Sequence, residues 1–158
     1  MSITLPGPTL GVVGGGQLGR MMGEAVARLG VDVVVLDPTP DCPASPVVSD
    51  QIVADFDDAD AVHELASRVD ALTFEIELAD PDVLAEASAE HDVPVQPDPD
   101  TLRTIQDKLV QKEALADAGI PVPEFVAVAT AEGLERVAEE FGGVMLKARE
   151  GGYDGRGN

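Results

Sequence analysis

The chain has 158 residues, 44% of them hydrophobic, with 30 acidic and 10 basic side chains and a formal net charge of −20. This apolar content can build a core, so the chain is not a disordered acidic tail, and its length suits one globular domain or slightly more. The charge repels nucleic-acid backbones and anionic membrane surfaces, which argues against both as partners. Lysine occurs only three times, as is typical of proteins from salt-loving cells, although an ordinary acidic protein fits the composition too.

No apolar run approaches the roughly 18 residues of a membrane span, and the first residues lack the basic and apolar regions of a secretory signal. We therefore expect a cytoplasmic protein. Cys42 can form no disulfide within the chain, and we expect it to be an ordinary loop or packing residue. His63 and His91 are far apart in the sequence, so we expect no metal site within this chain.

Residues 1–96 alternate short apolar runs with helical patterns, which predicts a Rossmann-like α/β domain with a parallel sheet. The expected strands are Thr9–Val13, Val31–Asp37, Gln51–Ala54, Ala71–Glu75 and Val93–Val95. The expected helices are Leu18–Leu29 with Gly30 at its end, Asp57–Arg68, and one that starts at Pro81 after the N-cap Asp80 and runs to about Glu90.

Residues 97–158 predict a second unit that is incomplete. Its expected elements are a helix over Thr101–Ala118, a strand over Phe125–Ala129, a helix over Glu132–Phe141 and a strand over Val144–Ala148. The last strand runs into a glycine-rich loop that begins at Gly151, and no partner strand follows it.

The first candidate site is a glycine pattern between a strand and a helix. Gly14-x-Gly16-x-x-Gly19 permits a tight turn whose backbone N–H groups face a phosphate, and Asp37 ends the next strand. The pattern fits a dinucleotide-binding fingerprint, although Gln17 is unusual inside such a turn. A tight turn without a ligand is the alternative.

The second candidate is the pair Glu75 and Glu77 at the carboxyl end of the fourth expected strand. Ligands of parallel sheets bind at that edge, and side chains two apart on a strand point the same way. In so acidic a chain, a solvated strand end explains the pair equally well.

The third candidate joins Lys108, Lys147 and the terminal glycine loop. A lysine that ends an apolar strand needs an anionic partner, and a nucleotide phosphate is a natural one. The loop offers backbone donors, and Arg156 adds positive charge. A hairpin tip with Asp154-Gly155 as its turn is compatible with this role.

Four segments together resemble the N5-carboxyaminoimidazole ribonucleotide synthetase family of the ATP-grasp superfamily. They are residues 14–21 (GGGQLGRM), Phe74-Glu75-x-Glu77, residues 106–112 (QDKLVQK) and residues 146–157, which include GGYDGRG. Each motif is weak alone, but the ordered set covers almost the whole chain.

The resemblance implies that ATP phosphorylates bicarbonate to carboxyphosphate, which carboxylates the exocyclic amine of 5-aminoimidazole ribonucleotide in purine biosynthesis. It implies a pre-ATP-grasp domain over residues 1–96, followed over 97–158 by a linker helix and the truncated start of an ATP-grasp domain. ATP and Mg²⁺ are the implied cofactors, and a homodimer is the implied assembly.

The resemblance also assigns roles to residues. ATP would be bound by Lys108, Lys147, Gly152, Tyr153, Asp154, Gly155, Arg156, Gly157 and Asn158. The aminoimidazole ribonucleotide would be bound by Gly16, Gln17, Leu18, Glu75, Tyr153, Asp154 and Arg156.

Two residues depart from the family pattern: Leu78 stands where asparagine is usual, and Asn158 where glutamine is usual. The family's catalytic, magnesium-binding and bicarbonate-site residues are expected beyond residue 158, so we expect these 158 residues alone to be inactive. Two alternatives remain, a Rossmann module that binds NAD or another nucleotide, and another purine-pathway ATP-grasp ligase such as the formate-dependent transformylase.

Overall fold

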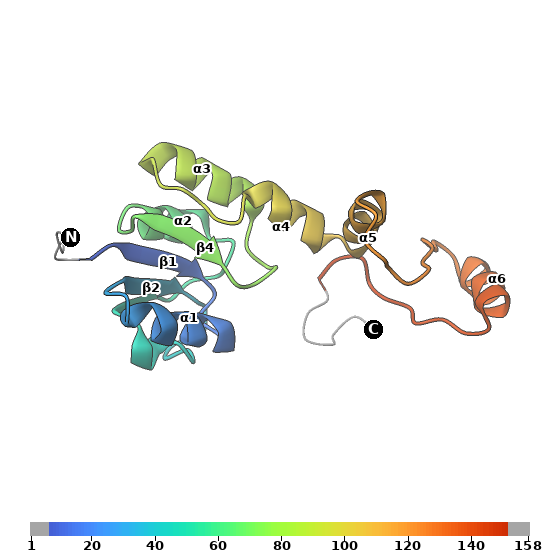
Figure 1. The fold of residues 1–158 in the computed structure, drawn as a ribbon, viewed down its shortest axis with the longest axis horizontal. Coiled ribbons are helices and arrows are strands. Elements are labelled where there is room, and N and C mark those ends of the chain that lie inside the picture. Colours follow the sequence, from blue (N-terminus) through green and yellow to red (C-terminus); the bar gives the residue numbers. More distant parts are fainter. Residues whose placement is uncertain (1–6, 152–158) are drawn as a thin grey trace. The chain divides into compact units, whose positions relative to one another are not determined.

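The computed structural model describes residues 7–151 of the chain (Figure 1). The chain divides into two compact units, Met1–Leu102 and Arg103–Asn158. Among the described residues, no helix has the length and apolar character needed to span a membrane.

The first unit is built on a parallel sheet of four strands in the order β3-β2-β1-β4. The strands are β1 (Thr9–Val13), β2 (Asp32–Leu36), β3 (Asp50–Ile52) and β4 (Ala71–Phe74). Val13 is in register with Leu36 on one side and with Phe74 on the other, so three strands end at the same edge. The chain order reverses beside β1, and such a switch point is where parallel sheets bind ligands. The predicted α/β class is confirmed.

Helices cover both faces of this sheet (Figure 1): α1 (Gln17–Ala27) one face, α2 (Ala59–Ala66) and α3 (Pro81–His91) the other. Val12 belongs to a buried cluster against which Met22 of α1 packs. Its neighbour Gly11 faces the opposite way, where a Cβ would lie 3.1 Å from Leu65 Cγ of α2. The glycine therefore allows α2 to approach β1 closely.

The predicted last strand, Val93–Val95, is reduced to one bridge. Val95 pairs with Leu72 in parallel, through a bond from the Leu72 N–H to the Pro94 carbonyl and one from the Gln96 N–H to the Leu72 carbonyl. Pro94 has no N–H to donate, so the ladder does not extend further toward the start of β4.

The helix predicted over Thr101–Ala118 is wrong as a single element. The structure has α4 (Pro99–Gln106) and α5 (Lys108–Asp117), separated at Asp107, whose backbone is extended. The Asp107 carboxylate accepts hydrogen bonds from the N–H groups of Leu109 at 2.8 Å and Val110 at 3.3 Å. It therefore starts a new helix as an N-cap.

In the rest of the second unit, α6 (Ala131–Phe141) confirms the predicted helix. The predicted strands Phe125–Ala129 and Val144–Ala148 are wrong, because neither segment is a strand in the part of the unit that is described. Both have the apolar composition of a strand. However, a strand exists only where a neighbour completes its hydrogen bonds, and the described residues of this unit supply no such ladder.

Asp107 also holds the segment after α6. Arg149 Nε donates to Asp107 Oδ1 at 3.0 Å, Arg149 Nη2 donates to Oδ2, and the Lys108 N–H donates to the Arg149 carbonyl at 2.8 Å. We call these contacts among residues 107, 108 and 149 the Asp107 latch. The Arg149 hydrogen bond is the main reason that the pKa of Asp107 is lowered to about 2; burial opposes it and the Leu109 and Val110 amides assist it.

This latch predicts an acid transition in α5. The pKa is lowered on folding, so the stabilisation is fully present above the unfolded value of about 3.9 and is lost as the pH falls through about 2. We expect the carboxyl carbon of Asp107 to titrate near pH 2 by NMR, and the Leu109 and Val110 amides to lose protection with it.

In the Arg149→Gln variant, the pKa of Asp107 should rise toward the ordinary range of an aspartate. Arg136→Gln, which removes the same charge from an exposed site on α6, should leave it in place. A midpoint near 3.9 in the unaltered chain would contradict the latch.

Candidate functional site

The glycine pattern forms a tight turn between β1 and α1, at the switch point of the sheet. Gly14 has a φ of +107°, which only glycine adopts readily, and its N–H donates to the Leu36 carbonyl at 2.9 Å. Gly16 is the N-cap of α1, with no side chain to cap it. A Cβ on Gly19 would lie 2.7 Å from the Gly14 carbonyl oxygen, so the third glycine lets the helix fold against the turn.

Asp37, the acidic residue of the fingerprint, points inward. Its Oδ2 accepts from the Gly15 N–H at 2.9 Å and its Oδ1 from the Thr39 N–H at 2.8 Å, and the residue is only 6% exposed. In a dinucleotide-binding domain this carboxylate would meet a ribose hydroxyl. Here it is an internal acceptor that fixes the turn, which argues against the NAD hypothesis.

Glu75 accepts a hydrogen bond from the next N–H group of the turn, that of Gly16. Its Oε1 accepts from the Gly16 N–H at 2.8 Å, while its own N–H donates to the Val13 carbonyl at 3.0 Å. A Cβ on Gly16 would lie 2.9 Å from Oε1, so any larger residue here would require the carboxylate to shift. Its negative charge also lies at the positive N-terminal end of α1, where an anion is stabilised.

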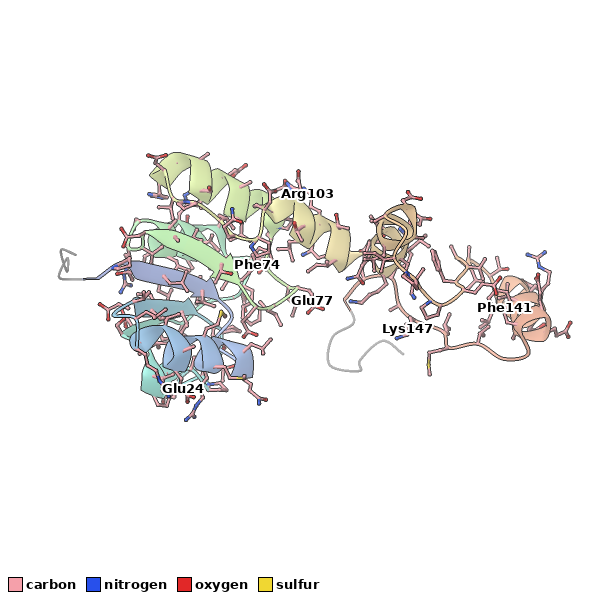
Figure 2. All side chains as sticks on the ribbon, in the orientation of Figure 1. Glu24, Phe74, Glu77, Arg103, Phe141 and Lys147 are labelled. Atoms are coloured by element: carbon pink, nitrogen blue, oxygen red, sulfur yellow. The ribbon has the colours of Figure 1, made fainter. Side chains whose placement is uncertain are left out.

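Glu77 lies elsewhere. β4 ends at Phe74, so the strand alternation that predicted a common direction for Glu75 and Glu77 does not reach them. Figure 2 shows Glu77 farther out on the loop that follows Phe74. Glu75 is therefore the member of the pair that meets the glycine turn.

Cys42 packs on the same turn from the loop after β2. It is 1% exposed, and its Sγ lies 2.4 Å from where a Cβ on Gly15 would be. Beside it, the Ala44 N–H donates to the Gly15 carbonyl at 2.9 Å. Its predicted role as a packing residue is confirmed, and this contact requires glycine at position 15.

The structure thus brings together two predicted substrate residues, Gly16 and Glu75, from motifs 59 positions apart. Gln17 and Leu18 follow in the first turn of α1, and both are exposed. N–H groups of a first helical turn have no acceptor within the helix, so this end of α1 can donate to a ligand.

In the second unit, the predicted nucleotide residues lie near the Asp107 latch. Lys108 is the first residue of α5, and Lys147 precedes Arg149 by two positions on an exposed segment (Figure 2). The third lysine, Lys112, lies with its Nζ 5.5 Å from the centre of the Phe125 ring, a cation–π contact. The other predicted residues of this site, 152–158, lie outside the described residues.

Asp107 and Arg149, which join α5 to the segment carrying Lys147, were not predicted as site residues. Asp107 lies within an apolar pattern at helical spacing, and this pattern concealed the cap. A capping aspartate directly before a helical run was the one available signal, since Arg149 is 42 positions away.

Two family comparisons agree with this architecture. Residues 8–106 match the ribonucleotide synthetase preATP-grasp domain, and residues 113–158 match the ATP-grasp domain. The chain therefore belongs to the ribonucleotide synthetase preATP-grasp family, and the start of an ATP-grasp domain follows.

Individual proteins are similar over nearly the whole chain. A phosphoribosylaminoimidazole carboxylase of Ogataea methanolica is 43% identical over 154 residues, which are 95% of this chain and 28% of that protein. A carboxyaminoimidazole ribonucleotide synthase of Aspergillus clavatus, solved with ATP, is 39% identical with a TM-score of 0.83, over 96% of this chain and 40% of that one. An N5-carboxyaminoimidazole synthase from the same fungus, solved with ADP and 5-aminoimidazole ribonucleotide, is 38% identical with a TM-score of 0.75, over 87% of this chain and 37% of that one. This chain thus spans well under half the length of these proteins.

The contact between Gly15 and Cys42 gives a test by double substitution. Gly15→Ala should lower the free energy of unfolding by about 1–3 kcal/mol, because the new Cβ overlaps the Cys42 sulfur. Cys42→Ala alone should lower the free energy of unfolding by about 1 kcal/mol, because the packing of the sulfur atom is lost. In urea unfolding, the double variant should lose about 1 kcal/mol less stability than the sum of the two single variants.

Gly23→Ala is the matched control, since a Cβ there would meet Val47 rather than Cys42. Its effect should add to that of Cys42→Ala. Simple additivity of Gly15→Ala with Cys42→Ala would show that the sulfur does not constrain the turn.

Proposed function

We propose that this chain is the N-terminal part of an ATP-grasp ligase that carboxylates 5-aminoimidazole ribonucleotide to N5-carboxyaminoimidazole ribonucleotide in purine biosynthesis. The observation that carries the proposal is the order of the two families, a ribonucleotide synthetase preATP-grasp domain followed by an ATP-grasp domain. Support comes from the similar Aspergillus clavatus enzyme that was solved with ADP and 5-aminoimidazole ribonucleotide.

The proposed reaction has two steps. A bicarbonate oxygen attacks the γ-phosphorus of ATP, so ADP leaves and carboxyphosphate forms. Carboxyphosphate then delivers its carbon as carbon dioxide with loss of phosphate, and the exocyclic amine of the ribonucleotide attacks that carbon and releases a proton. Phosphoryl transfer depends mainly on positioning and charge stabilisation, which backbone donors and lysines supply.

The first unit would bind the ribonucleotide at the glycine turn. Glu75 already accepts from the Gly16 N–H, and an ionised carboxylate can accept more than one donor, including a ribose hydroxyl or an amine. Gln17 and Leu18 are exposed beside it, so they are available to the ligand. We propose residues 1–96 as the pre-ATP-grasp domain and residues 97–158 as the linker helix and the start of the ATP-grasp domain.

The second unit would bind ATP through Lys108, Lys147 and the glycine loop over 152–158. The Asp107 latch supports this role, since it fixes the backbone just before that loop against the first turn of α5. Tyr153, Asp154 and Arg156 would in addition face the ribonucleotide.

Magnesium does not fit the described part of this unit. Asp107 is committed to Arg149 and the α5 amides, and among residues 103–151 no three ligand-type side chains converge. We propose that the ligands of the ion belong to the remainder of the ATP-grasp domain. Assembly as a homodimer and action in the cytoplasm complete the proposal.

Binding measurements on the 158-residue chain test this division of roles. By calorimetry, Glu75→Gln should weaken 5-aminoimidazole ribonucleotide about 10- to 100-fold through loss of a charged acceptor, and should leave ATP affinity unchanged. Lys147→Gln should weaken ATP binding and leave the affinity for 5-aminoimidazole ribonucleotide unchanged. Glu86→Gln, an exposed change of equal charge on α3, should affect neither ligand.

Three outcomes would contradict the proposal. They are an affinity for 5-aminoimidazole ribonucleotide that Glu75→Gln does not change, tight binding of NADH, and binding of the substrates of the formate-dependent transformylase in place of 5-aminoimidazole ribonucleotide. The chain alone should release no phosphate from ATP. Release that requires both bicarbonate and the ribonucleotide would overturn the assignment of catalytic residues to the remainder of the enzyme.

We further propose that the acidic surface is an adaptation to high salt, so salt should stabilise the fold. With a net charge of −20, the free energy of unfolding should rise steadily as KCl is raised from about 0.1 M to about 2 M, because salt screens self-repulsion. The control is the same series at a pH near the isoelectric point of about 4.1, where the salt effect should nearly vanish. Unfolding that is indifferent to salt at neutral pH would contradict the proposal.

A further inference from the structure

The two histidines of the chain, distant in sequence, meet in the first unit. His63 lies on α2 and His91 ends α3, with ring centroids 5.5 Å apart at an interplanar angle of 66°. Glu90 joins them, with its Oε2 3.3 Å from His63 Nδ1. One ligand atom from each of the three lies within 4.8 Å of the other two. The distance between the two histidines in the sequence, on which the expectation of no metal site depended, is therefore not a distance in space.

The ligand types match a first-row transition metal. Zinc binds imidazole nitrogen at about 2.0–2.1 Å and carboxylate oxygen at about 2.0–2.2 Å, so neighbouring ligand atoms of a tetrahedral site lie roughly 3.3 Å apart. His63 and Glu90 already have this separation. The third ligand atom lies within 4.8 Å of the other two, so a shift of about 1.5 Å or less would complete the set. Magnesium and calcium prefer sets of oxygen ligands, and so fit these three residues poorly.

His91, a partly buried residue, has a ring nitrogen without a hydrogen-bond partner in the described part of the chain. Its Nε2 is buried and has no hydrogen-bond partner among the described residues. A buried polar nitrogen without a partner costs free energy, and such groups in folded proteins usually have an explanation. The side chains of His63 and Glu90 are 26% and 68% exposed, so an ion can reach the cluster from solvent.

The cluster lies where a cation is favoured. It also lies at the opposite edge of the sheet from the glycine turn. His63 lies in the last turn of α2, and Glu90 and His91 in the last turn of α3, so two negative helix ends converge. Both helices run back along the parallel sheet (Figure 1), which puts their C-terminal ends at the amino edge of the strands. The glycine turn lies at the carboxyl edge, so a metal here would lie away from the proposed ribonucleotide site.

We propose that His63, Glu90 and His91 bind a divalent transition-metal ion, zinc being the best match, with water as the fourth ligand. The ion would join α2 to α3 and hold both helices on their face of the sheet. Nothing in the carboxylation reaction requires this site.

Cobalt(II) is the probe, because its visible absorption reports tetrahedral coordination by nitrogen and oxygen. The chelator-treated 158-residue chain would be titrated with Co²⁺ in excess Mg²⁺, which occupies the general acidic surface. We expect one equivalent to bind with a visible band, zinc to displace it, and zinc to raise the melting temperature. His63→Gln, Glu90→Gln and His91→Gln should each weaken binding at least about tenfold.

Glu86→Gln is the matched control, an exposed glutamate on the same helix, and should retain full binding. His63→Gln keeps the test decisive if His91→Gln fails to fold, since His63 is partly exposed. Absence of a stoichiometric band overturns the proposal and leaves the cluster as an edge-to-face packing contact. Binding that survives His63→Gln, or that is lost in Cys42→Ser, also overturns it.

Discussion

The carboxyl edge of the sheet in the first unit depends on two carboxylates that hold the glycine turn. Asp37 accepts from the Gly15 N–H and Glu75 from the Gly16 N–H, so the ends of β2 and β4 are tied to the end of β1. The turn is thereby fixed before any ligand arrives, together with the direction in which α1 leaves it. A phosphate cannot use these two donors, so this turn differs from the dinucleotide-binding turn whose glycine pattern it shares.

The first unit was predictable because its signals are local. Buried runs such as Val33–Leu36 are bounded by glycine, proline or aspartate, and Asp80-Pro81 opens α3 as its sequence indicates. The second unit was predicted less well because its structure depends on distant partners. Asp107 interrupts a helical pattern in favour of Arg149, and the apolar run Val144–Ala148 lacks the neighbour that would make it a strand.

The same distinction holds for the sites. Gly16 and Glu75 meet because parallel strands end at one edge, so each motif could be placed at that edge from the sequence, although their contact was not predicted. The inward direction of Asp37 could not be predicted, because it depends on the Thr39 N–H in the following loop. The meeting of His63 and His91 depends on how α2 and α3 pack, which no spacing in the sequence reveals.

The Asp107 latch makes the segment between residues 107 and 149 a closed loop, since its two ends are bonded to each other and α6 lies within it. For a flexible loop, doubling the length costs only about 0.6 kcal/mol in closure entropy. A change of length in the chain between the two ends therefore costs little closure entropy, and the latch still holds residue 149 at the start of α5. The latch thus sets the distance between the two ends of this segment independently of the length of chain between them.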